Sequence, residues 1–255
     1  MLKITNLKKT FNKNTENEIE VFQGLDIEFE ANKCTAIIGP NGCGKSTLMN
    51  IIAGSIPVDS GSIRIRGQEL AQLKEEDRSS HIGRVYQDPS MGVAPSLTIL
   101  ENMALADKKN KRFSLRPLVN KKKIGYYKDL LKQLDLGLEK LMDTKVKFLS
   151  GGQRQSLSLV MASMKHPDLL LLDEHTAALD PKTSHVVMNK TKDLIDSYEM
   201  TTIMISHNMK DAIKYSDRVI MLDKGKIVLD RDSKDLREED LNHIYISKIN
   251  KAIAL

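Results

Sequence analysis

The stretch Gly39-Pro-Asn-Gly-Cys-Gly-Lys-Ser-Thr47 decides how the rest of the chain is interpreted. It follows the apolar run 35–38, which is typical of a buried strand, and it precedes a helical pattern over 45–53. Glycines let backbone N–H groups turn inward around phosphate oxygens, and a helix N-terminus adds partial positive charge. An ordinary glycine-rich turn would not need the Lys-Ser ending in this context. The stretch therefore predicts a nucleotide-phosphate loop, with Lys45 on the β- and γ-phosphates and Ser46 on Mg²⁺.

The composition is that of a soluble globular protein. The 255 residues suffice for one large domain or two small ones, and 40% are hydrophobic and 29% charged. The net charge of +5 suits an anionic ligand or membrane surface but is too small to indicate nucleic acid, so we expect no nucleic-acid partner. No apolar run is long enough for a membrane span or a signal peptide. The two cysteines, Cys34 and Cys43, indicate no disulfide framework and favour a reducing, cytoplasmic location.

Hydrophobic periodicity predicts an α/β architecture. Alternating or continuous apolar residues predict strands at 2–7, 19–29, 35–38, 62–66, 83–86, 168–173, 201–206 and 218–223. Helical patterns occur at 45–53, 99–106, 121–134, 151–164, 181–197 and 208–215. The regular alternation of strand and helix after residue 151 is typical of a parallel sheet. We therefore expect a single domain over 1–255, with an α/β core at about 1–87 and 154–235, a helical insert at about 88–153, and a short C-terminal tail at 236–255.

A pair of acidic residues ends one of the predicted buried strands, Leu169-Leu-Leu-Leu-Asp173-Glu174. Successive side chains on a strand point to opposite faces, so the two carboxylates serve different places. Asp173 is the expected partner of Mg²⁺, and Glu174 is placed to orient or deprotonate the attacking water. Two solvated acids in a turn are the alternative, and the phosphate loop upstream makes that alternative weaker.

The order of these motifs resembles the ATP-binding-cassette (ABC) ATPases, and the resemblance covers nearly the whole chain. Its most specific sign is Leu149-Ser-Gly-Gly-Gln153, which looks like the signature loop of that family. The resemblance implies a P-loop NTPase (RecA-like) core with an N-terminal antiparallel β subdomain and an inserted α-helical signature subdomain. It also implies ATP and Mg²⁺ as cofactors and ATP hydrolysis as the reaction.

The resemblance implies a role for each matching residue. Glu174, His207, Lys45 and Gln87 would be catalytic, and Ser46, Gln87 and Asp173 would bind the metal. The ATP-binding residues would be Phe11, stacked on adenine, with Gly39, Pro40, Asn41, Gly42, Cys43, Gly44, Lys45, Ser46, Thr47, Ser150, Gly151, Gly152, Gln153 and Asp180. His207 is similar to the switch histidine that contacts the γ-phosphate, Gln87 to the Q-loop glutamine, and Asp180 to the D-loop aspartate.

Several of these residues have a simpler alternative. Phe11 could be a core aromatic, Gln87 could cap the turn before Pro89, and His207 could merely start a helix. Cys43 could be a reactive thiol near a helix N-terminus, although a small residue that the loop simply tolerates is the favoured interpretation. His175 stands where many members of the family have proline, and we assign it no catalytic role.

Two phosphate-binding loops in one chain predict a dimer. Ser150 opens a helix and so offers a second anion site made of backbone N–H groups. In the family, two subunits pack head to tail, so that Ser150 and Gly152 of one cover the γ-phosphate held by Lys45 of the other. We expect ATP to join the two copies and hydrolysis to separate them.

The resemblance favours an ATPase subunit of a membrane transporter, most similar to importers of amino acids, including the aromatic ones tryptophan and tyrosine. The implied partners are permease subunits, met by residues of about 88–106, and a substrate-binding lipoprotein; the implied location is the inner face of the cell membrane. The basic run 108–123 could face anionic lipid or simply water. The alternatives are an exporter ATPase, a membrane switch of the cell-division or mechanotransmission type, and a soluble ATPase of DNA repair or translation. No coiled-coil insertion separates Lys45 from Ser150, which disfavours the last.

Overall fold

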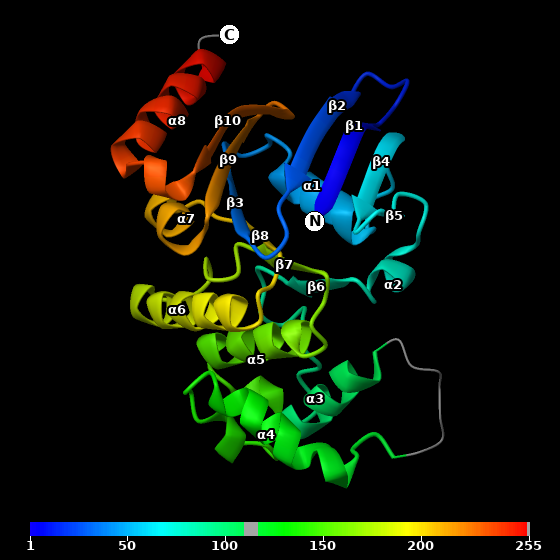
Figure 1. Ribbon diagram of the computed structural model, residues 1–255, viewed down its shortest axis with the longest axis vertical. Helices are drawn as coiled ribbons and strands as arrows, with labels where there is room; N and C mark the ends of the chain where they lie inside the picture. The colour runs from blue at the N-terminus through cyan, green and yellow to red at the C-terminus, as the bar shows by residue number, and fades with distance from the viewer. Residues whose placement is uncertain (110–116, 254–255) are drawn as a thin grey trace. The chain divides into compact units, whose positions relative to one another are not determined.

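A computed structural model describes residues 1–109 and 117–253 of the chain, with side chains through residue 245. The chain divides into two compact units (Figure 1). The first unit comprises 1–81 and 199–255, and the second comprises 82–198. The predicted limits of the helical insert, 88 and 153, both fall inside the second unit. No helix of the described part has the length and apolarity needed to cross a bilayer.

The first unit contains two sheets and five helical segments. Its strands are β1 (Leu2–Phe11), β2 (Ile19–Phe29), β3 (Cys34–Ile38), β4 (Ser60–Ile65), β5 (Gln68–Glu69), β8 (Thr202–Ile205), β9 (Arg218–Asp223) and β10 (Lys226–Asp232). Its helices are α1 (Lys45–Ala53), α2 (Glu75–Arg78), α7 (Met209–Tyr215), the short 3₁₀ turn η4 (Ser233–Asp235) and α8 (Glu238–Ile253).

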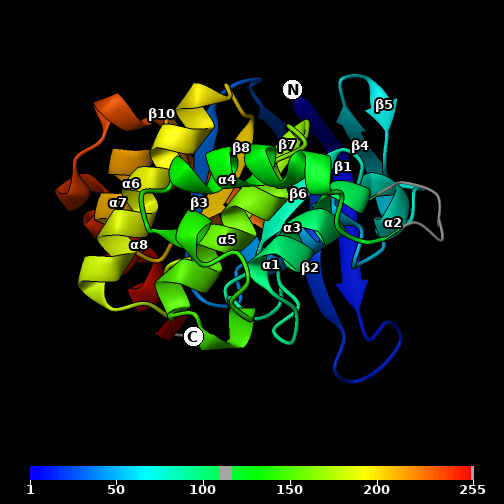
Figure 2. The same cartoon turned by 90° about the horizontal axis from the view of Figure 1, so that it is seen from below.

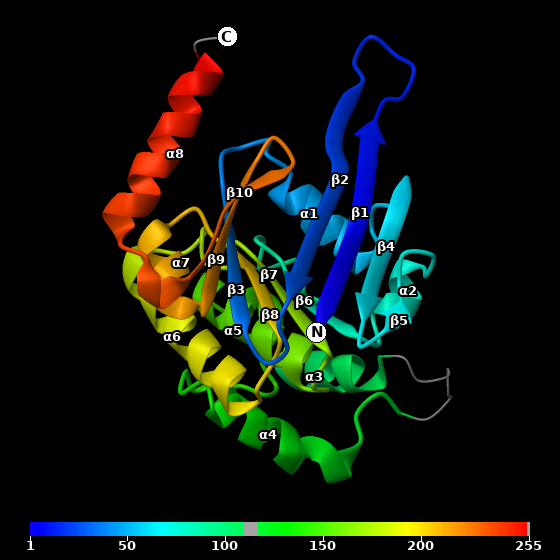
Figure 3. The same ribbon diagram turned by 45° about the horizontal axis from the view of Figure 1, so that its top comes forward.

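The two sheets of this unit differ in strand direction. Strands β2, β1, β4 and β5 form an antiparallel sheet in that order, and Figure 3 shows the first three side by side. In the other sheet, β3 pairs in parallel with both β8 and β9, and β10 returns antiparallel beside β9. All five residues of β3 are buried, as expected for a central parallel strand. This strand delivers the chain directly into the loop at 39–44.

The second unit is mostly helical. Its elements are β6 (Ile82–Val85), α3 (Ile99–Lys108), η1 (Lys121–Lys123), α4 (Ile124–Lys132), η2 (Leu138–Lys140), η3 (Val146–Phe148), α5 (Gly151–Ser163), β7 (Leu169–Asp173) and α6 (Pro181–Ser197). Strands β6 and β7 run parallel. Helix α5 packs on β6, α3, α4 and α6, and Figure 2 shows α3, α4 and α5 gathered together. Helix α5 is therefore the central support of this unit.

The sequence patterns missed two elements near the C-terminus. Strand β10 is half-buried to exposed along its length, so it lacks the apolar run that identifies β9. The predicted polar tail at 236–255 contains helix α8, which begins with three acidic residues in its first turn. Such acids stabilise a helix N-terminus, and this local signal could have indicated the helix.

Arg78 closes the C-terminal end of α1. It is 1% exposed, and its guanidinium donates to the carbonyl oxygens of Ile51 (2.6 Å) and Ile52 (3.0 Å) in the last turn of that helix. It also donates to the carbonyls of Leu73 and Ala71, both at 3.0 Å. A cation at this place satisfies helix carbonyls that have no partner within the helix and complements the helix dipole. Arg78 thus holds in place the helix whose other end carries Lys45 and Ser46.

We predict that Arg78→Met destabilises the chain by about 3 kcal/mol, because several buried carbonyls lose a charged donor. Urea unfolding followed by circular dichroism measures the change. Lys74→Met, on an exposed residue one turn earlier, is the matched control and should change the unfolding free energy by less than about 0.5 kcal/mol. Equal effects of the two substitutions would contradict the capping role.

Candidate functional site

The loop at 39–44 packs closely through its backbone, with glycine at both of its ends. A Cβ on Gly39, whose φ is 148°, would lie 2.2 Å from the carbonyl oxygen of Leu222 in β9, so no side chain fits there. Gly44, with φ 109°, is the N-cap of α1 and contributes no side-chain cap. The first N–H groups of α1 therefore have no partner within the helix and are available to an anion.

Lys45 places a buried positive charge in this loop. The residue is 5% exposed, and its ammonium donates to the carbonyl oxygens of Gly39 (2.8 Å) and Pro40 (3.0 Å). Both partners are neutral carbonyls, so no protein anion among them neutralises the ammonium. The buried cation lies next to the uncapped N-terminus of α1. Ser46, the next residue, is exposed. This arrangement fits the phosphate groups of a nucleotide.

Cys43 is a buried part of the same loop. It is 4% exposed, and burial raises the pKa of its thiol above the ordinary value. Its carbonyl oxygen accepts from the N–H of Gly225 at 3.0 Å, which ties the loop to the β9–β10 turn. A raised pKa lowers the thiolate fraction, so the geometry supports the tolerated small residue over the reactive thiol.

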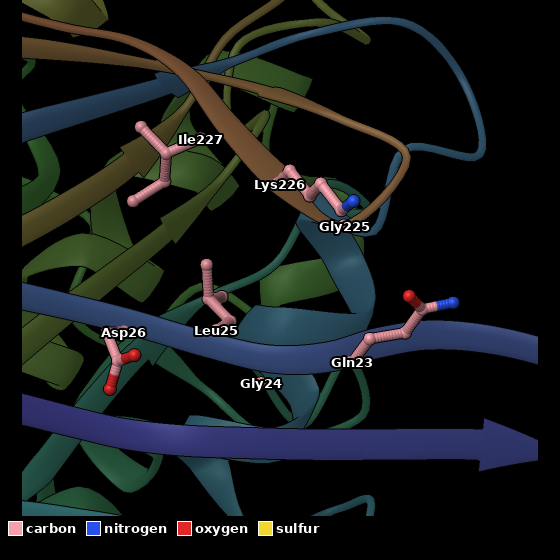
Figure 4. Close-up of a pocket in the computed structure, with 7 residues that line it drawn as sticks. All are labelled: Gln23, Gly24, Leu25, Asp26, Gly225, Lys226 and Ile227. Atoms are coloured by element: carbon pink, nitrogen blue, oxygen red, sulfur yellow. The ribbon is translucent and has the colours of Figure 1, made fainter.

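Two other predicted residues belong to the first unit. Phe11 ends β1, is half-buried rather than part of the core, and has the ammonium of Lys9 5.0 Å from its ring centroid. His207 is exposed in the turn between β8 and α7. A pocket of about 410 Å³ lies between β2 and the β9–β10 hairpin (Figure 4). Its seven lining residues include none of the predicted site residues.

The second unit contains the acidic strand end. Asp173 is the last residue of β7, and its carboxylate pairs with Arg84 of β6 at 3.2 Å. Glu174 follows with φ 45°, a left-handed conformation that is uncommon for a residue with a Cβ. The backbone therefore leaves the strand conformation immediately after Asp173.

His175 fixes this turn from inside the unit. It is 2% exposed, and its Nε2 lies 3.1 Å from the hydroxyl oxygen of Thr191. That hydroxyl donates its only proton to the carbonyl of Val187, so Nε2 of His175 is the donor in their contact. Burial lowers the pKa of His175 to about 4, and the imidazole is neutral at physiological pH. It is a structural residue rather than a titrating group of the site.

The signature loop starts α5 with a capping box. Ser150 accepts from the N–H of Gln153 at 3.2 Å, and the side chain of Gln153 accepts from the N–H of Ser150 at 3.1 Å. A Cβ on Gly152 would lie 2.3 Å from Cγ2 of Thr183, so the loop packs against the start of α6. Asp180 caps α6 by accepting from the N–H of Thr183, and these hydrogen bonds lower the pKa of its carboxyl. The signature loop and the segment of Asp180 are thus held together.

The remaining predictions have mixed outcomes. Gln87 is exposed just after β6, and the structure gives it no role as a turn cap among the hydrogen bonds of the described residues. In the basic run, Lys123 forms an ion pair with Asp107 at 2.5 Å and Lys108 donates to the carbonyl of Pro117. Lys111, Arg112 and Arg116 lie outside the described residues. The individual site roles stay predictions.

The donor chemistry also fits Mg²⁺. The described residues contain no cluster of three or more His, Cys, Asp or Glu side chains that could cage a metal by themselves. Mg²⁺ usually binds through one or two protein oxygens, several waters and substrate phosphates, and dedicated protein cages are the exception. Hydroxyl, amide and carboxylate oxygens of the predicted set, Ser46, Gln87 and Asp173, are of this kind. The set therefore suits a metal that arrives with a nucleotide.

Comparison with known proteins identifies the family. A family profile described as "ABC transporter" matches residues 22–177, more than half of the chain. The chain belongs to the ABC transporter family. Its reaction is ATP hydrolysis, with ATP and Mg²⁺ as cofactors, as the motifs predicted. The predicted fold class, a P-loop NTPase with antiparallel and helical additions, is also confirmed.

Two relatives and one solved structure illustrate the similarity of this ABC ATPase to others. It is 46% identical to a tyrosine transport ATP-binding protein of Clostridioides difficile (strain R20291), over 94% of this chain and 95% of that protein. It is 32% identical to a phosphonates import ATP-binding protein of Ruegeria sp. (strain TM1040), over 96% and 94%. A dimeric ATP-binding cassette in a post-hydrolysis state, bound to ADP and Pi, has a TM-score of 0.77 at 28% identity, covering 91% of this chain and 99% of that one.

Sequence reasoning missed two residues that shape the acidic strand end. Arg84 is the one charged residue in the short strand Ile82-Gly-Arg-Val85, and an ionic side chain in such a strand signals a nearby counter-charge. His175 was recognised only as a departure from proline. Its burial and its bond to Thr191 could not be read from local sequence.

The buried His175 predicts a pH-dependent stability. Its folded pKa of about 4 lies below the ordinary 6.5, so the unfolded chain binds the proton more readily. Its contribution is fully present above pH 6.5 and is lost as the pH falls towards 4, by about 1.4 kcal/mol per pH unit. The free energy of unfolding, measured by urea titration at pH 4 to 8, should fall more steeply for the natural chain than for His175→Gln. Parallel pH profiles of the two proteins would contradict the assignment.

Proposed function

We propose that this ABC ATPase energises an importer of aromatic amino acids such as tyrosine. The observation that carries the proposal is the 46% identity, over nearly the full length of both chains, to a tyrosine transport ATP-binding protein. Other relatives are described as import ATP-binding proteins, which supports uptake over export. On this proposal the chain binds permease subunits at the cytoplasmic face of the membrane, together with a substrate-binding lipoprotein of the same system.

Each predicted site residue has a proposed role in binding or hydrolysing ATP. Lys45 and the N–H groups at the start of α1 hold the phosphates, and Ser46 and Asp173 serve the metal with Gln87. Glu174 orients and deprotonates the attacking water, and His207 contacts the γ-phosphate. Phe11, half-buried at the end of β1, stacks on the adenine ring.

Dimerisation supplies the coupling to transport. A second copy contributes Ser150, Gly151, Gly152 and Gln153 over the γ-phosphate, and Asp180 lies with them at the start of α6. The exposed Ser150 and the dimeric form of the similar cassette support this arrangement. ATP then holds two copies together, and loss of the γ-phosphate separates them.

Lys45→Met should greatly weaken ATP binding, because the loop loses the buried ammonium that donates to the carbonyls of Gly39 and Pro40. Fluorescent-nucleotide titration measures the loss, which should exceed about a hundredfold in affinity. Lys122→Met, on an exposed lysine of the second unit, is the control and should leave affinity unchanged. Normal ATP affinity in Lys45→Met would refute the assignment of the loop.

Glu174→Gln should slow hydrolysis by at least about a hundredfold, because glutamine cannot accept a proton. Glutamine has nearly the same size and should tolerate the left-handed backbone as glutamate does, so the fold should be kept. The variant should elute as a stable dimer in MgATP and as a monomer without nucleotide. A monomer under both conditions, in a variant that still binds ATP, would count against ATP-driven dimerisation.

Substrate stimulation tests the transport role. The chain would be co-expressed with its own permease and binding protein and reconstituted in proteoliposomes. L-tyrosine should raise the ATPase rate several-fold, whereas leucine and methylphosphonate should not. Stimulation by the phosphonate alone would assign the chain to the other group of importers represented among its relatives.

A further inference from the structure

Arg84 links the acidic end of β7 to a pocket in the second unit. In the parallel pair of β6 and β7, Arg84 lies opposite Leu171, so Asp173 follows two residues later on the same face. Its Nη2 lies 3.2 Å from Oδ2 of Asp173, and the side chains are only 11% and 15% exposed. The contact is therefore a shielded, hydrogen-bonded ion pair, which is stronger than a pair on the surface.

The same arginine also lines a pocket of about 390 Å³. Its guanidinium carbon lies 4.6 Å from the ring centroid of Tyr86. The other walls come from the segment after β6, from the end of α3 and from α5, and they include Met91, Leu105, Lys109 and Met161. Arg84 thus belongs at once to the pocket wall and to the ion pair with Asp173.

The pocket combines exposed apolar side chains with positive charge. Met91 is 66% exposed and Leu105 is 48% exposed, so both offer apolar surface to a ligand in the pocket. The charged side chains among these lining residues, Arg84 and Lys109, are both cationic. A carboxylate carried on an apolar segment would complement this pocket, and it would compete with Asp173 for the guanidinium of Arg84.

The guanidinium of Arg84 weakens the interaction of the Asp173 carboxylate with a divalent cation. The carboxylate accepts from Arg84 through one of its oxygens, and the positive charge repels a second cation nearby. Any change that draws Arg84 towards the pocket therefore strengthens the interaction of Asp173 with the metal. By thermodynamic linkage, metal binding must loosen the ion pair to the same extent.

We propose that Arg84 is a positioning residue that couples this pocket to Asp173, so that a carboxylate entering the pocket raises the affinity of the nucleotide-bound protein for its divalent cation. The proposal rests on the proposed function in one respect, namely that Asp173 binds the metal. Arg84 thereby becomes a regulatory contact. A partner segment that brings an acidic side chain into the pocket increases the affinity of the site for the metal.

The first test measures metal affinity rather than turnover. Mn²⁺ binding to the full chain, saturated with a non-hydrolysable ATP analogue, is followed by electron paramagnetic resonance. Arg84→Gln should bind Mn²⁺ about tenfold more tightly than the natural chain, because the competing cation is gone. Arg84→Lys keeps the charge and should stay within about twofold of the natural chain. Unchanged or weaker Mn²⁺ binding in Arg84→Gln would overturn the proposal, since a merely structural arginine predicts a loss.

The second test places an acid in the pocket. Met161→Glu should tighten Mn²⁺ binding several-fold, whereas the neutral control Met161→Gln should not. In the Arg84→Gln background, Met161→Glu should have no further effect, because the coupling runs through the arginine. Equal tightening in both backgrounds would show a direct charge effect and overturn the coupling. Circular dichroism confirms that each variant is folded.

A separate measurement distinguishes this inference from the proposed function. Binding of the ATP analogue without metal is titrated in EDTA for every variant. If the natural chain fails to bind the analogue, the nucleotide site itself is wrong. If all variants bind it equally and Arg84→Gln leaves Mn²⁺ affinity unchanged, only the role of Arg84 is wrong.

Discussion

The close approach of Gly39 to β9 is the constraint on which the phosphate loop depends. The backbone of Gly39 lies against the carbonyl of Leu222, where a Cβ would be only 2.2 Å from the oxygen. The N–H of Gly225 donates to Cys43 from the turn that follows β9. Strand β3 and the loop are therefore supported by the β9–β10 hairpin, which lies about 180 residues further along the chain. The ammonium of Lys45 folds back onto carbonyls of this supported loop, and its position follows from theirs.

Helix α1 has opposite electrostatic requirements at its two ends. Its first turn lacks a side-chain cap and presents N–H groups and Lys45, which favours an anion. Its last turn presents carbonyls, and the buried guanidinium of Arg78 satisfies them. The positive charge of Arg78 at the closed end stabilises the helix, because it lies near the negative end of the helix dipole. The helix is thus anchored where no ligand is needed and left open where phosphate binds.

Local sequence was sufficient for the parts whose chemistry is local. Glycines in the loop at 39–44, the apolar run of β3 and the helix start at Ser150 can each be recognised from a few neighbouring residues. Contacts between distant residues were not predictable. Arg84 and Asp173 are 89 positions apart, and only the parallel register of β6 and β7 brings them together. The half-exposed β10 was missed because its partner β9, and not its own pattern, determines its conformation.

The turn after Asp173 is held by packing in this chain. Glu174 has a left-handed backbone that a residue with a Cβ adopts at an energetic cost, so its surroundings must hold it. Proline, found after this glutamate in many ABC ATPases, restricts the chain covalently by fixing its own φ and limiting the residue before it. His175 has no such covalent restriction. It is instead locked by burial and by donating Nε2–H to Thr191, whose proton is committed to Val187. Packing against α6 holds the residue that follows Glu174, and the turn that carries Glu174 depends on the neutral state of a histidine.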